Sequence, residues 1–90
     1  MDAVDNDTSA ETAALRLALR LNCAACDVKL GQWGDAASQC SEALKLDKDN
    51  AKALFRRGTA RSHMGELDEA RADLVAACRL APADKSIREE

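Results

Sequence analysis

Apolar residues recur at three- and four-residue spacing along four stretches of the chain, and this pattern predicts four helices. The first is expected to begin at Thr8-Ser9-Ala10-Glu11, a capping box in which the Thr8 hydroxyl and the Glu11 carboxylate bond free backbone amides. It continues for about twenty residues without Pro or Gly and ends at Gly31 as a glycine cap. Residues 1–8 are acidic and are predicted to be a disordered leader. The apolar positions that set the spacing of this helix are Leu15, Leu19, Cys23, Cys26 and Leu30.

Short polar or glycine-containing connections separate the other three helices. They are expected at residues 35–46, 51–64 and 66–80, with Asn50 as the N-cap of the third helix. The segment around Pro82 ends the fourth helix, and residues 83–90 are predicted to start a further one. Because the connections are short, consecutive helices should pack antiparallel as hairpins.

The two hairpins are copies of each other with an offset of 34 residues, which maps Gly31 on Gly65 and Ala36 on Ala70. A helix-turn-helix unit with a 34-residue period is the tetratricopeptide repeat (TPR) signature. At its small, large apolar and proline positions the second copy has Gly58, Ala70, Leu74 and Pro82, and the first has Ala24, Ala36, Cys40 and Lys48. The sequence therefore predicts an all-α fold within residues 9–82, with two TPR-like repeats at about 9–48 and 51–82.

Composition and charge limit the classes of function that the sequence is compatible with. The chain is 47% hydrophobic but only 2% aromatic, so its apolar content is mostly Ala and Leu, which favour helices. A net charge of -3 argues against nucleic-acid binding, which needs a dense basic surface. No signal-peptide pattern and no apolar run of ~18 residues occur, so a cytoplasmic protein with four free thiols is expected.

Two cations on the third predicted helix are the leading candidates for function. Lys52 and Arg56 are four residues apart, which places them one turn apart on one helix face. Under the 34-residue shift Asn22 coincides with Arg56, so these two occupy equivalent sites on neighbouring helices. The three side chains should converge on one surface suited to an acidic partner.

Three stretches of the sequence resemble the TPR domain of FKBP-type immunophilin co-chaperones, a peptidyl-prolyl isomerase family that docks on heat-shock chaperones. These stretches are LNCAACDVKLGQW, EALKLDKDNAKALFRRGTA and ELDEARADL. The resemblance covers about residues 11–90 and corresponds to the second and third repeats of a three-repeat domain. It implies a non-enzymatic peptide-binding module, with any isomerase active site in a separate domain.

The resemblance also implies a carboxylate clamp for the C-terminal Glu-Glu-Val-Asp of a chaperone. Asn22 falls on the amide that hydrogen-bonds the terminal carboxylate of the peptide. Lys52 falls on the lysine that meets the side chain of the last Asp, and Arg56 on the arginine that contacts upstream carbonyl or Glu groups. The family's remaining clamp Lys and Asn belong to a first repeat that this chain does not contain, so the expected clamp is partial.

Two other classes of function stay open at this point. In the first, the repeats form a scaffold that binds partner helices or a copy of itself, because nothing in the sequence covers the leucines of the first helix, and a homodimer through that helix is possible. In the second, Cys23-x-x-Cys26 holds a metal or acts in redox chemistry. That class ranks last, because no second cysteine pair has ligand spacing and no strands are predicted.

The remaining conspicuous side chains have structural interpretations. The cysteines are expected to be small buried residues, and Trp33 is expected to fill the helix-turn connection. Arg57 lies about 100° around the helix from Arg56 and is assigned to the structural side. His63 has no partner at catalytic spacing, and the sequence calls for no metal and no cofactor.

Overall fold

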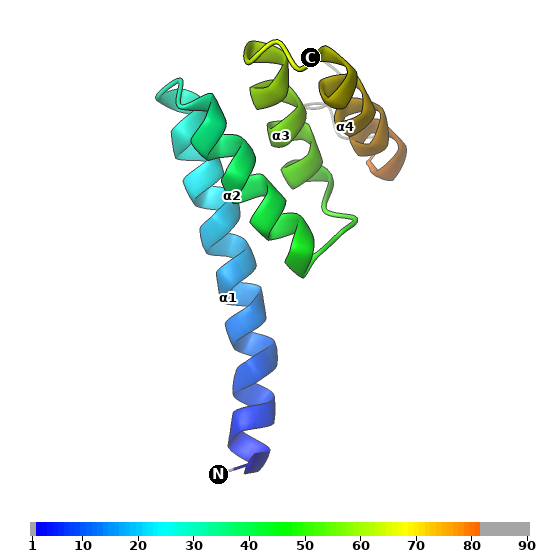
Figure 1. Cartoon of the computed structure of the whole chain (residues 1–90). Helices are drawn as coiled ribbons and strands as arrows, with labels where there is room; N and C mark the ends of the chain where they lie inside the picture. The colour runs from blue at the N-terminus through cyan, green and yellow to red at the C-terminus, as the bar shows by residue number, and fades with distance from the viewer. Residues whose placement is uncertain (1, 82–90) are drawn as a thin grey trace.

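Four helices form two antiparallel hairpins in the computed structural model, which describes the backbone of residues 2–81 and the side chains of residues 11–81 (Figure 1). The helices are α1 (Asp2–Lys29), α2 (Trp33–Leu46), α3 (Ala51–His63) and α4 (Leu67–Leu80). The predicted all-α class and its TPR hairpins are confirmed. The further helix expected at residues 83–90 lies outside the described residues.

The first helix starts earlier than its capping box predicts. α1 begins at Asp2 and is 28 residues long, so the leader expected to be disordered is helical over residues 2–8. The physical reason is that no Pro or Gly precedes Gly31, so nothing in the covalent chain stops a helix from extending toward the N-terminus. α1 consequently projects well past the end of α2 (Figure 1).

The turns of the two hairpins have the same hydrogen bonds at positions 34 residues apart. Gly31 and Gly65 have φ angles of 74° and 82°, a left-handed conformation that favours glycine. In the first turn the Gln32 N–H donates to Asp27 O at 2.8 Å, and in the second the Glu66 N–H donates to Arg61 O at the same distance. The internal repeat is therefore present at the level of single backbone bonds. Asn50 caps α3 as predicted, because its Oδ1 accepts the Ala53 N–H at 2.9 Å.

Small residues allow the helix axes to approach closely. Gly58 of α3 is buried against α4, and a Cβ built on it would lie 2.8 Å from Leu74 Cγ. At the equivalent positions of the first hairpin, buried Ala24 belongs to the same core cluster as buried Cys40. The first hairpin thus has a larger residue where the second has Gly58, and a smaller one, Cys40, where the second has Leu74. Burial raises the pKa of the Cys40 thiol to about 11, so this thiol stays protonated at neutral pH.

The face of α1 that enters the core differs from the predicted one. Leu17 and Leu21 pack against the core cluster, whereas Leu15 and Leu19 are 64% and 62% exposed. Cys23 and Cys26 are exposed as well, so their predicted burial is wrong, and of the four free cysteines Cys40 is the buried one. The reason is that α1 carries apolar residues on two opposite sides, and the spacing of one side resembles that of the other.

A buried carboxylate ties α4 to α3. Asp73 is 4% exposed, and its two oxygens accept Arg57 Nη2 and Nε, both at 2.9 Å. Arg61 Nη1 adds a third bond at 3.0 Å, and Arg57 Nη1 donates to Ser41 Oγ of α2 at 3.2 Å. The bond to Asp73 raises the pKa of the Arg57 guanidinium. Arg57 therefore has the structural role predicted for it.

An aromatic stack joins the two hairpins at one end. The ring of Trp33, at the start of α2, lies on that of His63, at the end of α3, with centroids 3.9 Å apart and an interplanar angle of 4°. Trp33 is half-buried, so it packs as expected, but its partner belongs to the next hairpin. No helix within residues 2–81 is both long and apolar enough to cross a membrane.

Candidate functional site

Arg56 connects α3 to α1 across the inner side of the two hairpins. Its side chain is half-buried, and Nη1 donates a hydrogen bond of 3.0 Å to the carbonyl oxygen of Leu21. Leu21 is the residue before Asn22, so the guanidinium lies against the turn of α1 that carries this predicted amide. One N–H of the five on a guanidinium makes this bond, which leaves the others available to a ligand.

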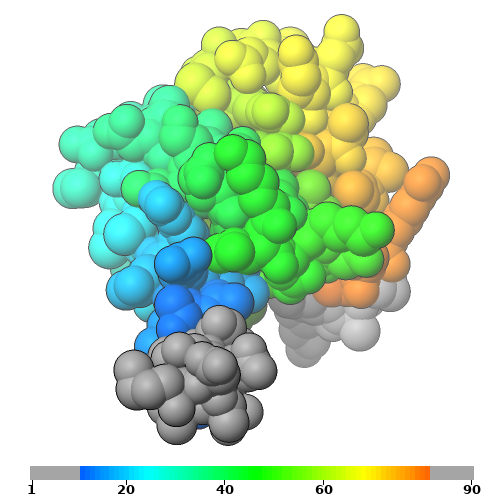
Figure 2. Space-filling model, turned by 60° about the horizontal axis from the view of Figure 1, so that its bottom comes forward, coloured from blue at the N-terminus to red at the C-terminus, as the bar shows by residue number. Residues whose placement is uncertain are grey.

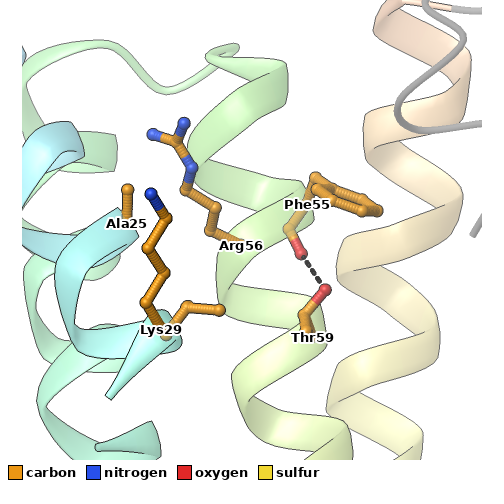
Figure 3. Close-up of a pocket in the computed structure, with 6 residues that line it drawn as sticks. Ala25, Lys29, Phe55, Arg56 and Thr59 are labelled. Carbon is orange, nitrogen blue, oxygen red and sulfur yellow. Dashed lines mark hydrogen bonds between the residues drawn. The ribbon is translucent and has the colours of Figure 1, made fainter. Parts of the chain in front are cut away.

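A cavity of about 310 Å³ lies between α1 and α3 beside this contact (Figure 3). Ala25, Val28 and Lys29 line it from α1, and Phe55, Arg56 and Thr59 line it from α3. Thr59 Oγ1 donates to Phe55 O at 3.0 Å, which fixes that hydroxyl on the helix surface. The cavity therefore combines an apolar wall with two cationic side chains.

The charged ends of Lys29 and Arg56 lie on the same side of this cavity (Figure 3). None of the described residues that line it is acidic, although the whole chain has a net charge of -3. A carboxylate entering the cavity would therefore meet two positive charges and no negative one. Such charge-assisted contacts are among the stronger polar contacts a protein makes when they are partly desolvated.

The three predicted site residues take different positions relative to the cavity. Arg56 lines it, whereas Asn22 and Lys52 are exposed and lie beside it on the same helices. Among residues 11–81, no side chain forms a hydrogen bond or an ion pair with the Lys52 ammonium. Its ammonium group is therefore unpaired within the described part of the chain.

Lys29 is not among the residues predicted from the sequence, although its spacing points to it. It follows Asn22 by seven residues and Ala25 by four, so the three share one stripe of α1. Lys52, Arg56 and Thr59 form the corresponding stripe of α3, at spacings of four and three. Two facing stripes, each with polar and cationic groups, make up the candidate site.

The fold and the sequence together define the class of this protein. The tetratricopeptide repeat family matches residues 40–72, a segment that begins within α2, includes the turn and all of α3, and ends within α4. The four helices of the chain form TPR hairpins.

Its sequence is closely similar to the TPR regions of FKBP-type isomerases, as the motifs predict. It is 44% identical over 84 residues to the peptidyl-prolyl cis-trans isomerase FKBP4 of Bos taurus, covering 92% of this chain and 18% of that protein. It is 43% identical over 77 residues to FKBP42 of Arabidopsis thaliana, covering 86% of this chain and 21% of that protein. The chain thus spans about a fifth of the length of these relatives.

Solved structures with the same fold include an immunophilin and a peptide complex. The C-terminal TPR-containing domain of an FK506-binding protein of Plasmodium falciparum superposes with a TM-score of 0.82 at 35% identity, over 86% of this chain and 51% of that one. The first TPR domain of Spaghetti (RPAP3), bound to the HSP90 peptide SRMEEVD, superposes with a TM-score of 0.75 at 30% identity, over 81% and 58% of the two chains.

Proposed function

We propose that this chain is a peptide-binding TPR module of an FKBP-like co-chaperone, which recognises the acidic Glu-Glu-Val-Asp tail of heat-shock chaperones. The observation that carries the proposal is the cavity between α1 and α3, where Lys29 and Arg56 place two cations beside an apolar wall. The structural neighbour bound to an HSP90 peptide with this ending supports the choice of ligand.

Each site residue has a role suited to its chemistry. The Asn22 amide donates to the terminal carboxylate of the peptide, and the Lys52 ammonium pairs with the side chain of the last Asp. Arg56 keeps its bond to Leu21 O and offers its remaining donors to an upstream carbonyl or Glu group. These three form the proposed partial carboxylate clamp.

Lys29 and the apolar wall of the cavity extend this site toward the residues that precede the last Asp of the peptide. Lys29 places a further positive charge where a second acidic side chain would lie, and Phe55 and Val28 offer contact to an apolar side chain between the acidic ones. A tail with alternating acidic and apolar groups matches this arrangement better than a run of carboxylates alone.

The module acts without catalysis in this proposal. Its relatives are isomerases about four to five times its length, and we place isomerase activity in a separate domain of such a protein. We place the module in the cytoplasm, because its exposed free thiols Cys23, Cys26 and Cys78 suit a reducing compartment.

A peptide titration tests the proposal. A Met-Glu-Glu-Val-Asp peptide is titrated into the chain by calorimetry, in parallel with the same peptide amidated at its C-terminus. We expect amidation and Lys52→Ala each to weaken binding at least ~10-fold, the equivalent of about 1.4 kcal/mol. Lys48→Ala, which removes an exposed lysine from the α2–α3 turn, is the matched control and should bind like the unmodified chain.

Arg56→Ala is measured beside these variants, and its helical circular dichroism is recorded because Arg56 also holds Leu21 O. A dissociation constant that is the same for the free and the amidated peptide, and for Lys52→Ala and Lys48→Ala, would contradict the proposal. In that case the cations are only a solvated helix face.

A further inference from the structure

A second hollow, of about 300 Å³, lies between α1 and α2 and is separate from the cavity of the candidate site. We call it the α1–α2 hollow, and its lining residues are Arg16, Arg20, Glu42, Lys45 and Leu46. Figure 2 shows the segments that carry them next to each other, the blue part of α1 beside the green end of α2. Lys29 of the candidate site follows Arg20 by nine residues, about two and a half helical turns, so the two sites lie on opposite sides of α1.

The two arginines lie on the side of α1 that faces α2. Each follows an exposed leucine, Leu15 or Leu19, by one residue, so it is about 100° around the helix from that leucine. Arg20 Nη1 donates a hydrogen bond of 2.9 Å to Gln39 Oε1 of α2. The α1–α2 hollow is therefore formed within a single hairpin.

The second hairpin shows that the fold does not need a cation at this place. Under the 34-residue shift Arg20 corresponds to Leu54 of α3. Leu54 is 8% exposed and forms a core cluster with Ala77, against which Ala76 and Ala81 pack. Apolar side chains thus fill in one hairpin the place where the other has an arginine and an open hollow.

The charges of the two arginines are available to a ligand. Among residues 11–81 neither of them takes part in an ion pair, and the partner of Arg20, the Gln39 amide, is neutral. Glu42 is the one carboxylate in the lining, and its Oε2 is 2.8 Å from Lys45 Nζ. The hydrogen bond from Lys45 lowers the pKa of the Glu42 carboxyl, so this pair stays ionised at neutral pH.

The spacing of the cations favours a ligand with separate carboxylates. Arg16 and Arg20 are four residues apart, which places their Cβ atoms roughly 6 Å apart on α1. Side chains two residues apart on an extended peptide have nearly the same separation, about 6.6 Å, and lie on the same side of it. A single phosphate would instead concentrate its charge near Glu42. Leu46, which is 43% exposed, adds an apolar contact at the same hollow.

We propose that the α1–α2 hollow binds an extended acidic segment of a partner protein. Two carboxylates of this segment, two residues apart, pair with Arg16 and Arg20, and a neighbouring apolar side chain contacts Leu46. The proposal does not depend on the carboxylate clamp, because it uses other side chains on the opposite side of α1. A partner could therefore occupy both sites at once.

A peptide without terminal charges tests the proposal. The probe is acetyl-Glu-Ser-Glu-Ser-Leu-amide, and acetyl-Gln-Ser-Gln-Ser-Leu-amide is its uncharged control. We titrate each into the ¹⁵N-labelled chain and follow the amide resonances by NMR. The acidic probe should shift the amides of residues 16–20 and 39–46 and leave those of residues 52–59 unchanged. Its affinity should fall as the salt concentration rises, because exposed charges are screened.

Substitutions at the hollow have effects of opposite sign. We expect Arg16→Ala and Arg20→Leu each to weaken binding of the probe about three- to fivefold, as is usual for exposed charge pairs. Glu42→Gln should strengthen binding, because it removes the lining carboxylate and frees Lys45. Arg71→Ala, at an exposed arginine of α4, is the matched control and should bind normally. Lys52→Ala should bind this probe normally as well, which separates the result from that for the clamp.

Arg20→Leu also tests whether the arginine serves the fold. Because Leu54 packs at the equivalent position, this variant should be at least as stable to urea as the unmodified chain. Lower stability would mean that Arg20 is a structural residue, and the comparison of the hairpins would no longer support a site.

Three binding results would overturn the proposal. Equal affinity for the acidic and the uncharged probe would show that the arginines do not select carboxylates. Shifts confined to residues 52–59 would place the probe at the clamp. If inorganic phosphate shifts the amides of residues 16–20 and the acidic probe does not, the occupant is a phosphate group and not an acidic segment.

Discussion

Gly58 is where a single atom decides how closely two helices pack. A Cβ at this position would lie 2.8 and 2.9 Å from Leu74 Cγ and Cδ2 and 3.2 Å from the backbone oxygen of Ala70. We expect Gly58→Ala to lower the free energy of unfolding by about 1–2 kcal/mol, because an overpacking cost of up to about 3 kcal/mol outweighs the ~1 kcal/mol that Ala gains in helix propensity. Urea denaturation measures the change.

The first hairpin provides the control for this substitution. Ala24 and Cys40 occupy the positions of Gly58 and Leu74 and are both fully buried. Adding Leu74→Cys to Gly58→Ala recreates this pair and should recover part of the lost stability. If Gly58→Ala alone is as stable as the unmodified chain, the helices can separate without cost and the packing argument fails.

Asp73 is the buried charge on which the α3–α4 contact depends. Asp73→Asn keeps the shape of the side chain but removes the charge that Arg57 and Arg61 share. We expect a loss of about 2–3 kcal/mol in unfolding free energy, below the figure for a fully buried pair because both arginines keep some solvent contact. The comparison is Glu42→Gln, which breaks the exposed pair with Lys45 and should not change stability measurably. Equal denaturation midpoints for the two variants would contradict this ranking.

Side chains on one helix could be grouped from the sequence, whereas contacts between helices could not. Lys52 and Arg56 share a face because of their spacing alone, and the same rule would have included Lys29 with Asn22. The bonds from Arg57 to Asp73 and to Ser41 each join residues sixteen apart on different helices. No periodicity encodes such pairs, because they depend on how the helices cross.

For α1, the spacing of apolar residues predicted a helix correctly but did not predict which side of that helix is buried. Both sides of this helix carry leucines at helical spacing, and only the contact with α2 and α3 determines that Leu17 and Leu21 enter the core. We expect Leu17→Ala to cost about 1–2 kcal/mol, the lower range for a partly buried leucine, and Leu15→Ala to change stability by less than ~0.5 kcal/mol. Thermal unfolding of the two variants measures this difference. If Leu15→Ala cost more than Leu17→Ala, the exposed face of α1 that carries Leu15 and Leu19 would be the stabilising one.

The two hairpins form one unit because α2 and α3 contact each other. The 34-residue period predicted the two hairpins, and the structure adds the contacts that couple them, namely Arg57 with Ser41 and the Trp33–His63 stack. Adjacent repeats in such arrays are stabilised mainly by this nearest-neighbour interface. Because Trp33 is the single tryptophan of the sequence, its fluorescence reports directly on the junction.

The Trp33–His63 stack should therefore contribute to the stability of the whole array. We expect His63→Ala to lower the free energy of unfolding by about 0.5–1.5 kcal/mol, the usual value of a stacked aromatic pair, and His63→Phe to retain most of it. Urea unfolding is followed by Trp33 fluorescence and by helical circular dichroism, which should coincide in the unmodified chain if the hairpins unfold together. Ser62→Ala, at the exposed neighbouring position, is the control. If His63→Ala matches Ser62→Ala in both signals, the rings are in contact without holding the hairpins together, and the coupling must come from Arg57 and the apolar contacts of α2 with α3.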